Sequence, residues 1–564
     1  MKLTGIFNGA IYSTNAAALL LGAAGLLSRV LGIFRDRLLA DRFGAGRELD
    51  LYYAAFQIPD FMVVIFLLGA GSAAILPIFQ EYLARDHEEA RKLISDLFSI
   101  FLWGSILAAL IAFLAAPFLI HLIAPGFSQE EQALTVTLTR IMLISPILFG
   151  LSNIFSTVVQ SFQRFLAYAA APVLYNLGII FGILVFVPIW GVRGLALGVI
   201  LGALLHFGLQ LAVTHNLGFG PRLMRPGFNE GVKKVFRISF PRVLSVSLSR
   251  LTMIVLVALG STFEEGSIAV FQLAQNLYFM PIGIFGVSYA VAIFPRLSRA
   301  YVEGKAREFF QDFMLGTRAI LFWIVPATVL FIVLRAHIVR VAFGSGAFSW
   351  EDTRLTAAVL AILAISMSAE ALITFLMKGF YALENTWIPF FVNIGASFLS
   401  IFLAILFSEA LASPSSFTSF VTAVLRISDI GDSRVAGLAL GFSIGSLLNV
   451  VLLYGAMLWL FRRTFGENHR VPLAGIGKII LASLLAGGAA YAVRVSFAET
   501  LPLITFAAVL LQGFIAGAIG ISVYFGTLFI LKEEEVFSLW RTLRAHLFKV
   551  GILPQSWEGE TPIH

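Results

Sequence analysis

The chain has 564 residues, of which 59% are hydrophobic and 13% charged, a composition too apolar for a soluble globular domain. Its formal net charge of +7 does not indicate nucleic-acid binding, because the basic residues lie mainly between apolar segments, where they orient membrane proteins. The absence of cysteine excludes disulfides, thiol chemistry and cysteine-based metal sites. With a mean hydropathy of +0.91, the chain is predicted to be an all-α polytopic membrane protein.

Apolar stretches long enough to cross about 30 Å of hydrocarbon recur along the chain. We predict fourteen transmembrane helices, separated by connections too short for a folded soluble domain. The first stretch is too long and too interrupted by arginine for a cleavable signal sequence. The stretches are residues 10–39, 51–80, 93–122, 134–160, 166–187, 192–214, 238–260, 267–295, 309–334, 355–381, 388–408, 435–461, 474–495 and 503–531.

The first stretch carries four charged residues inside or at the edge of an apolar helix: Arg29, Arg35, Asp36 and Arg37. A charge near the bilayer centre costs ~2.5–3.5 kcal/mol on insertion scales, so such side chains usually face a protein interior or a watery cavity. Asp36 neutralises part of this cluster and leaves it cationic. Alternatively, Arg35 and Arg37 only mark a helix end at the membrane interface.

Lysine and arginine are concentrated in the two termini and in alternate loops. The positive-inside rule therefore predicts that both termini lie in the cytoplasm. The most basic connections are residues 215–237 and 296–307, which we interpret as topology determinants and lipid-surface contacts rather than a partner-binding site.

Three motifs recur in the same order and orientation, six helices apart, which indicates two parallel repeats. The third pair is spaced more widely than the first two, which locates about 26 additional residues near 413–433. We expect an external loop with one short interfacial helix there. The pairs are PVLYNLG at 172–178 and PFFVNIG at 389–395, AAILPIF at 73–79 and VAIFPRL at 291–297, and GLALG at 194–198 and 437–441.

Two six-helix lobes follow from these repeats, with the last two helices appended. Lobes of this kind leave a central cavity, the usual substrate path in transporters built from repeats. We expect an N-terminal lobe over residues 1–215, a C-terminal lobe over 216–470, helices thirteen and fourteen over 471–531 and a cytoplasmic tail over 532–564.

Catalysis has little support, since no pair of acids is spaced for acid–base chemistry and neither an HExxH motif nor a phosphate-binding Gly-Lys-Ser/Thr loop occurs. We therefore expect no enzyme activity. His206 predicts an interhelical hydrogen bond rather than a proton relay. Glu370 is either a buried, hydrogen-bonded carboxyl or a group that titrates or coordinates a cation.

Arg250 is a second isolated cation, in the seventh apolar stretch, with no acid between Arg242 and Gly260 to neutralise it. Because Arg29 and Arg250 open the two lobes, the cavity between the lobes is expected to be electropositive. Guanidinium groups bind phosphate through two parallel hydrogen bonds, so this cavity suits a phosphate-bearing substrate. Alternatively, Arg250 pairs with Glu370 or with backbone carbonyls.

Several motifs together resemble the MurJ/MviN family of lipid II flippases, within the multidrug/oligosaccharidyl-lipid/polysaccharide exporter superfamily. The resemblance covers essentially the whole chain. Its motifs are SRVLGIFRD at 28–36, FGAG at 43–46 followed by Asp50, NIFSTVVQSFQRF at 153–165, APVLYNLGII at 171–180, MPIGIFGVSYAVAIFPRLS at 280–298, FYALENTWIP at 380–389 and GLALGFSIGSLLN at 437–449.

This resemblance implies a bacterial inner-membrane protein that moves undecaprenyl-diphosphate-linked peptidoglycan precursor to the outer leaflet by alternating access. The family residues needed for transport map by motif onto Arg29, Arg35, Asp36 and Asp50. The family's last two helices form a groove for the polyprenyl tail. We expect the lipid-linked glycan and membrane lipids as partners, a monomer, and neither a cofactor nor a metal.

Two departures from the family pattern concern the headgroup contacts. Val63 and Leu68 stand where better-known members have an arginine and a glutamate, and Gln275 and Asn276 stand where those members have Asp-Arg. We therefore assign Arg250 and Asn276 to the candidate substrate site, with Arg250 supplying the cation that Asn276 does not.

Other functions remain as alternatives. Within transporters, these are a flippase for another undecaprenyl-diphosphate glycan and a cation-coupled drug exporter of the same superfamily. From other classes, they are a polyprenyl-dependent membrane glycosyltransferase and a non-transporting scaffold for envelope synthesis.

Overall fold

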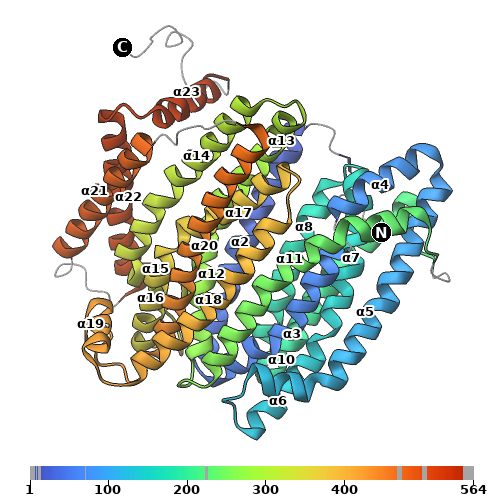
Figure 1. Cartoon of the computed structure of the whole chain (residues 1–564). Helices are drawn as coiled ribbons and strands as arrows, with labels where there is room; N and C mark the ends of the chain where they lie inside the picture. Colours follow the sequence, from blue (N-terminus) through green and yellow to red (C-terminus); the bar gives the residue numbers. More distant parts are fainter. Residues whose placement is uncertain are drawn as a thin grey trace. The chain divides into compact units, whose positions relative to one another are not determined.

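The computed structural model describes residues 7, 9–10, 14–69, 72–222, 227–466, 473–497 and 505–549. Within these ranges the chain forms helices joined by short turns, and no strand occurs (Figure 1). The predicted all-α fold is therefore confirmed.

The helices follow one another with few residues between them. Up to residue 261 they are α2 (Thr14–Phe43), α3 (Arg47–Gly69), α4 (Ser72–Arg85), α5 (His87–Ile123), α6 (Gln129–Met142), α7 (Ile144–Ser161), α8 (Phe165–Phe181), η1 (Gly182–Phe186), α9 (Val187–Trp190), α10 (Arg193–Thr214), η2 (His215–Phe219) and α11 (Glu230–Ser261).

From residue 267 onward the helices are α12 (Ser267–Pro281), η3 (Ile282–Gly286), α13 (Val287–Val302), α14 (Ala306–Val333), α15 (Arg335–Phe343), α16 (Trp350–Ile365), α17 (Met367–Ala382), α18 (Trp387–Ala412), α19 (Ser416–Leu425), α20 (Arg434–Phe465), α21 (Leu473–Ser496), α22 (Phe506–Ile530) and α23 (Glu534–Lys549).

Each of the fourteen predicted stretches lies largely in helix over its described residues, with breaks such as those at Leu143 and Ser366. Eleven helices in this part of the chain are long and apolar enough to cross a membrane, or twelve if the bent pair α16 and α17 forms one span. The first and seventh stretches, in α2 and α11, are not among these, so the number fourteen stays a prediction. The short helix expected near 413–433 is present as α19.

The chain divides into two compact units. Unit 1 comprises residues 1–276, 342–359 and 393–445, and unit 2 comprises residues 277–341, 360–392 and 446–564. The predicted lobe boundaries near residues 215 and 470 stay a prediction.

Unit 1 is packed through glycines on the GLALG helix α10. A Cβ on Gly202 would lie 2.4 Å from the Tyr175 carbonyl oxygen, and a Cβ on Gly198 would lie 2.8 Å from Gly182 Cα. Such close backbone contacts pack helices together where lipid tails provide no hydrophobic driving force. The second GLALG motif, on α20, packs in the same manner, since a Cβ on Gly441 would lie 2.2 Å from the Ala404 backbone nitrogen of α18.

Unit 2 holds α21 and α22 against α14 through polar contacts as well as apolar packing. Arg318 of α14 pairs with Glu533 at 2.7 Å, and Lys478 of α21 reaches the same carboxylate at 3.2 Å. Farther along, His337 Nε2 and Gln512 Oε1 lie 2.8 Å apart. These contacts attach the last two apolar helices to the unit at two separate levels.

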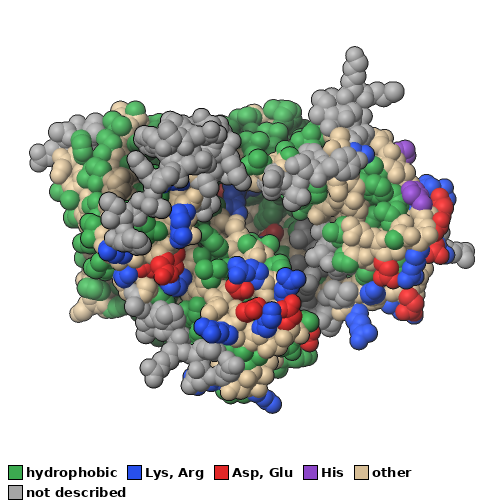
Figure 2. All heavy atoms as spheres, turned by 90° about the horizontal axis from the view of Figure 1, so that it is seen from above, with side chains coloured by type: hydrophobic (Ala, Val, Ile, Leu, Met, Phe, Trp, Pro, Cys, Tyr) green, Lys and Arg blue, Asp and Glu red, His purple; other side chains and the backbone are tan. Residues whose placement is uncertain are grey.

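Charged side chains gather on the face seen in Figure 2, as blue and red spheres. In unit 1, Lys234 donates to Glu81 at 3.0 Å, and this hydrogen bond lowers the pKa of the Glu81 carboxyl. In unit 2, Lys305 pairs with Glu303 at 2.8 Å and Glu308 at 3.3 Å. Exposed pairs of this kind each contribute little to stability.

The close backbone packing of α8 against α10 can be tested by substitution. Gly202→Ala should lower the thermal unfolding temperature of the purified protein, because the new methyl group meets a backbone carbonyl that cannot move aside. Overpacking of this kind costs ~1–3 kcal/mol. Gly208→Ala, on the same helix, is the control, since no atom lies within 4 Å of its added Cβ. Equal unfolding temperatures for the two variants would contradict this account of the packing.

Candidate functional site

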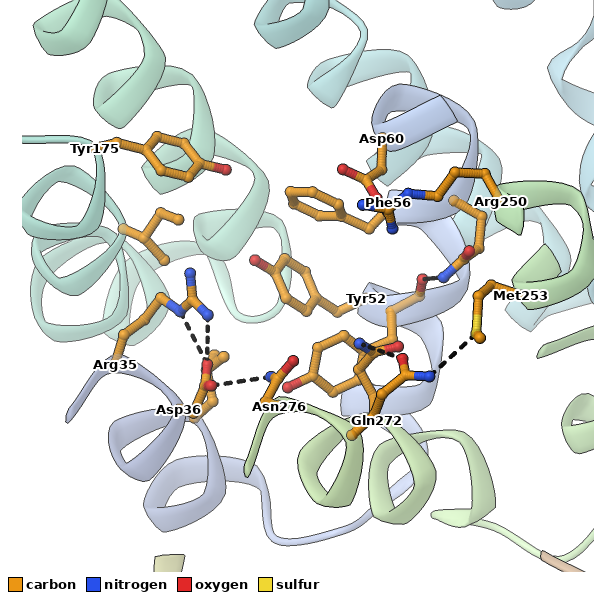
Figure 3. Close-up of a pocket in the computed structure, with 15 residues that line it drawn as sticks. Arg35, Asp36, Tyr52, Phe56, Asp60, Tyr175, Arg250, Met253, Gln272 and Asn276 are labelled. Atoms are coloured by element: carbon orange, nitrogen blue, oxygen red, sulfur yellow. Dashed lines mark hydrogen bonds and ion pairs between the residues drawn. The ribbon is translucent and has the colours of Figure 1, made fainter. Parts of the chain in front are cut away.

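A pocket of about 310 Å³ lies in unit 1, among side chains of α2, α3, α8, α11 and α12 (Figure 3). Arg35 and Asp36 lie on one side of it, Asp60 and Arg250 lie on the other, and aromatic side chains of α3 lie between them. Its lining is Arg35, Asp36, Leu39, Tyr52, Tyr53, Phe56, Gln57, Asp60, Tyr175, Ile179, Arg250, Met253, Gln272, Gln275 and Asn276.

Asp36 joins α2 to α12 on one side of the pocket. Its Oδ1 accepts hydrogen bonds from Arg35 Nε at 2.9 Å and Nη2 at 2.7 Å, and its Oδ2 accepts from Asn276 Nδ2 at 2.9 Å. The Asp36 side chain is only 5% exposed, so its charge is sheltered from water and matched by the neighbouring guanidinium. The structure thus brings together three of the predicted site residues.

Asn176 of α8 is a functional candidate that was not predicted from the sequence, although it lies in the repeated PVLYNLG motif. Its Oδ1 accepts from Arg35 Nη1 at 3.2 Å, while its Nδ2 lies 3.2 Å from the Ser28 and Pro172 carbonyl oxygens. Asn176 therefore helps to fix the orientation of the Arg35 guanidinium group. The signal that could have indicated this role is the recurrence of an asparagine within an apolar helix of both repeats.

Arg250 is paired, so the prediction that it lacks a neutralising acid is wrong. Its Nη1 lies 2.7 Å from Asp60 Oδ2 of α3, and the two side chains are 45% and 32% exposed. The prediction failed because it considered acids on the same helix and Glu370, whereas the partner comes from a helix distant in the sequence. Glu370 itself accepts a hydrogen bond from Ser446 Oγ at 2.6 Å in unit 2.

The charges that line this pocket balance. Arg35 and Arg250 are matched by Asp36 and Asp60. The pocket therefore offers two guanidinium groups to an anion only in competition with its own carboxylates. The electropositive cavity expected between the lobes stays a prediction.

Arg29 lies outside the lining of this pocket. It is partly exposed on α2, six residues before Arg35, which corresponds to about 9 Å along a helix. Among the residues that the structure describes, no hydrogen bond or ion pair involves its side chain. Its assignment to the substrate site stays a prediction.

Asp50 is not part of the lining of the pocket. Its carboxylate is 1% exposed and accepts from the backbone N–H groups of Gly266 at 2.7 Å and Ala269 at 2.8 Å. A carboxylate at this position satisfies the free N–H groups of a helix start and interacts favourably with the helix dipole. Asp50 therefore positions the start of α12, the helix that carries Gln272 and Asn276 to the pocket.

His206 and the acidic side chains were the remaining polar candidates from the sequence. His206 Nδ1 lies 2.7 Å from Ser152 Oγ of α7, which confirms the predicted interhelical hydrogen bond. Within the described ranges, no three histidine, aspartate or glutamate side chains come together as a metal site requires.

Removing the carboxylate that holds α12 should destabilise unit 1. Asp50→Ala leaves two buried N–H groups without acceptors, and lost hydrogen bonds to charged groups cost ~1.5–3 kcal/mol each. We expect a lower unfolding temperature and a lower yield of folded protein in detergent. Asp429→Ala, which removes only an exposed partner of Arg354, is the control. An Asp50→Ala protein as stable as this control would refute the capping role.

Comparisons with known proteins agree with the resemblance seen in the sequence. The family model described as lipid II flippase MurJ matches residues 39–512. A probable lipid II flippase MurJ from Rhizobium meliloti is 26% identical over 539 residues, covering 93% of this chain and 95% of that protein.

Two solved structures share the fold. A lipid II flippase MurJ in an inward closed conformation has a TM-score of 0.71 at 23% identity and covers 92% of this chain and 100% of its own. An inward-facing multidrug resistance MATE family transporter of the MOP superfamily has a TM-score of 0.61 at 18% identity, covering 78% and 95%. The extent of the family match, over most of the chain, shows that this multi-pass membrane protein belongs to the lipid II flippase MurJ family.

Proposed function

We propose that this chain is a lipid II flippase, which moves undecaprenyl-diphosphate-linked peptidoglycan precursor across the bacterial cytoplasmic membrane. The observation that carries the proposal is a pocket, in a member of this family, that presents guanidinium groups from two different helices. A diphosphate offers several oxygens to such groups, and arginine binds them with two parallel hydrogen bonds.

In this proposal Arg35 contacts the diphosphate, Asp36 and Asn176 orient Arg35, and Arg250 supplies a second cation from α11. The Arg35 side chain is 23% exposed and lines the pocket, so an anion reaches it without unfolding any helix. Arg29, with no partner among the described residues, is proposed to contact the headgroup one to two turns farther along α2. Asn276 contributes through Asp36, its hydrogen-bond partner.

The proposal also includes the parts of the topology that sequence reasoning supports. Both termini lie in the cytoplasm, the two repeats form lobes around a central cavity, and substrate crosses by alternating access. The protein acts as a monomer. The polyprenyl tail binds along α21 and α22, where exposed apolar side chains such as Leu484 and Phe514 suit a long hydrocarbon chain.

A second candidate is a flippase for another undecaprenyl-diphosphate glycan. The observation that favours it is Asn276, which replaces a family arginine and is engaged with Asp36. The diphosphate contacts would be shared by both substrates, whereas the sugar contacts would differ.

Rescue of growth tests the flippase proposal. In a bacterium depleted of its own lipid II flippase, the wild-type chain should restore growth, whereas Arg35→Lys should not, because lysine keeps the charge but loses the planar guanidinium whose three nitrogens bond Asp36 and Asn176. Arg29→Ala should fail too, although removal of an intramembrane charge eases membrane insertion. Arg42→Lys, an exposed position on the same helix, should rescue as wild type does.

If the wild-type chain inserts normally into the membrane but does not restore growth, the second candidate, a flippase for another undecaprenyl-diphosphate glycan, replaces the first. Rescue of growth by Arg35→Lys would show that transport does not need the planar guanidinium group of Arg35.

The tail assignment has its own test. Deleting residues 474–531 should stop lipid II flipping in proteoliposomes while the truncated protein still inserts into the membrane, since the deletion removes the proposed hydrocarbon-binding surface. Flipping that persists at the wild-type rate would mean that α21 and α22 only face lipid.

A further inference from the structure

The two ion pairs of the pocket differ in how firmly they are held. Arg35 uses Nε, Nη1 and Nη2 in hydrogen bonds to Asp36 and Asn176. Among the side chains that the structure describes, Arg250 makes a single ion-pair contact, from Nη1 to Asp60 Oδ2. Both members of the Arg250 pair are also more exposed than Arg35 and Asp36. Within the described ranges, Arg250 is therefore the guanidinium with more donors left for an anion and the greater exposure.

Asp60 is placed so that it can leave Arg250 without disturbing the fold. It belongs to α3 and lies at the pocket surface opposite Arg35 and Asp36 (Figure 3). Among the described residues, Arg250 is the one ion-pair or hydrogen-bond partner of its carboxylate. By contrast, Asp36 holds Asn276 and Asp50 holds the start of α12, so those carboxylates have structural duties that Asp60 lacks.

We propose that Asp60 is an internal counter-ion, which neutralises Arg250 when the pocket is empty and is displaced when the diphosphate of the substrate binds. This inference rests on the proposed flippase function and adds a residue that sets the affinity of the site. Asp60 does not hold the substrate; it competes with the substrate for Arg250.

Charge and geometry favour this exchange. A diphosphate carries more negative charge than a carboxylate and presents oxygens to both edges of the guanidinium, whereas Asp60 makes one contact. Partly exposed ion pairs are weak, so displacing Asp60 costs little. The displaced carboxylate stays beside the bound diphosphate and repels it, which favours release. A carrier needs this compromise, because a site that binds too tightly does not let its cargo leave.

Binding measurements on the purified full chain in detergent test the proposal. The probes are undecaprenyl diphosphate, inorganic pyrophosphate and, as a neutral lipid, undecaprenol. Asp60→Asn keeps the shape of the side chain but removes its charge, so it should lower the dissociation constant for undecaprenyl diphosphate roughly five- to tenfold. Asp60→Glu, which keeps the charge, should bind as wild type does. Asp429→Asn, which breaks an ion pair outside the pocket, should also bind as wild type does.

A double-mutant cycle separates competition from a packing effect. If Asp60 acts through Arg250, the gain from Asp60→Asn should vanish in the Arg250→Gln background. In proteoliposomes, Asp60→Asn should lower both KM and kcat for lipid II, since the substrate binds more tightly and leaves more slowly. A purely structural role for Asp60 would lower kcat without tighter binding.

The outcomes distinguish this inference from the proposed function. If wild type binds undecaprenyl diphosphate but Asp60→Asn binds it equally or more weakly, the counter-ion role is refuted while the flippase proposal stands. The counter-ion role is also refuted if Asp60→Asn still tightens the binding of undecaprenyl diphosphate in the Arg250→Gln background. If wild type prefers undecaprenyl diphosphate no more than undecaprenol, both proposals fail. Binding of pyrophosphate without undecaprenyl diphosphate would make a free diphosphate the ligand and would also refute the exchange with a lipid substrate.

Discussion

A charge inside a membrane protein is costly unless another group compensates it, and three carboxylates of unit 1 follow this constraint. Asp36 is matched by Arg35, Asp60 by Arg250, and Asp50 by two backbone N–H groups at the start of α12. Each compensation joins residues on different helices or holds a guanidinium at the pocket surface. The contacts of Asp36 and Asp50 also connect α2 and α3 to α12, whereas the Asp60–Arg250 pair lies at the surface of the pocket.

Close backbone packing at glycines also holds the helices together. Two GLALG motifs place glycines where α10 meets α8 and where α20 meets α18, so backbones approach to distances that any side chain would prevent. This agreement between two distant segments supports the internal repeat by a criterion independent of sequence spacing. It also explains why glycine recurs at these positions in helices that otherwise favour bulkier apolar residues.

Features encoded along one helix were predictable from sequence, and features encoded between helices were not. Hydropathy located the helices, the change of motif spacing located α19, and the family was identified from its motifs. The pairing of Arg250 with Asp60, the contact of Asn176 with Arg35 and the role of Asp50 at α12 each join segments far apart in the chain. Periodicity within one helix does not indicate which residue of another helix it will meet.

The glycine contacts between α8 and α10 have a mechanical consequence. The added Cβ atoms of Gly178, Gly182 and Gly194 would each meet backbone of the facing segment, at three successive levels. Two helices packed in this way cannot slide by a fraction of a turn without a steric clash, so they form one rigid unit. Asn176 and Tyr175 belong to this rigid unit, and the Arg35 side of the pocket is therefore rigid. If the proposed function holds, any adaptation to the size of a bound headgroup falls to the opposite side of the pocket, formed by α3 and α11.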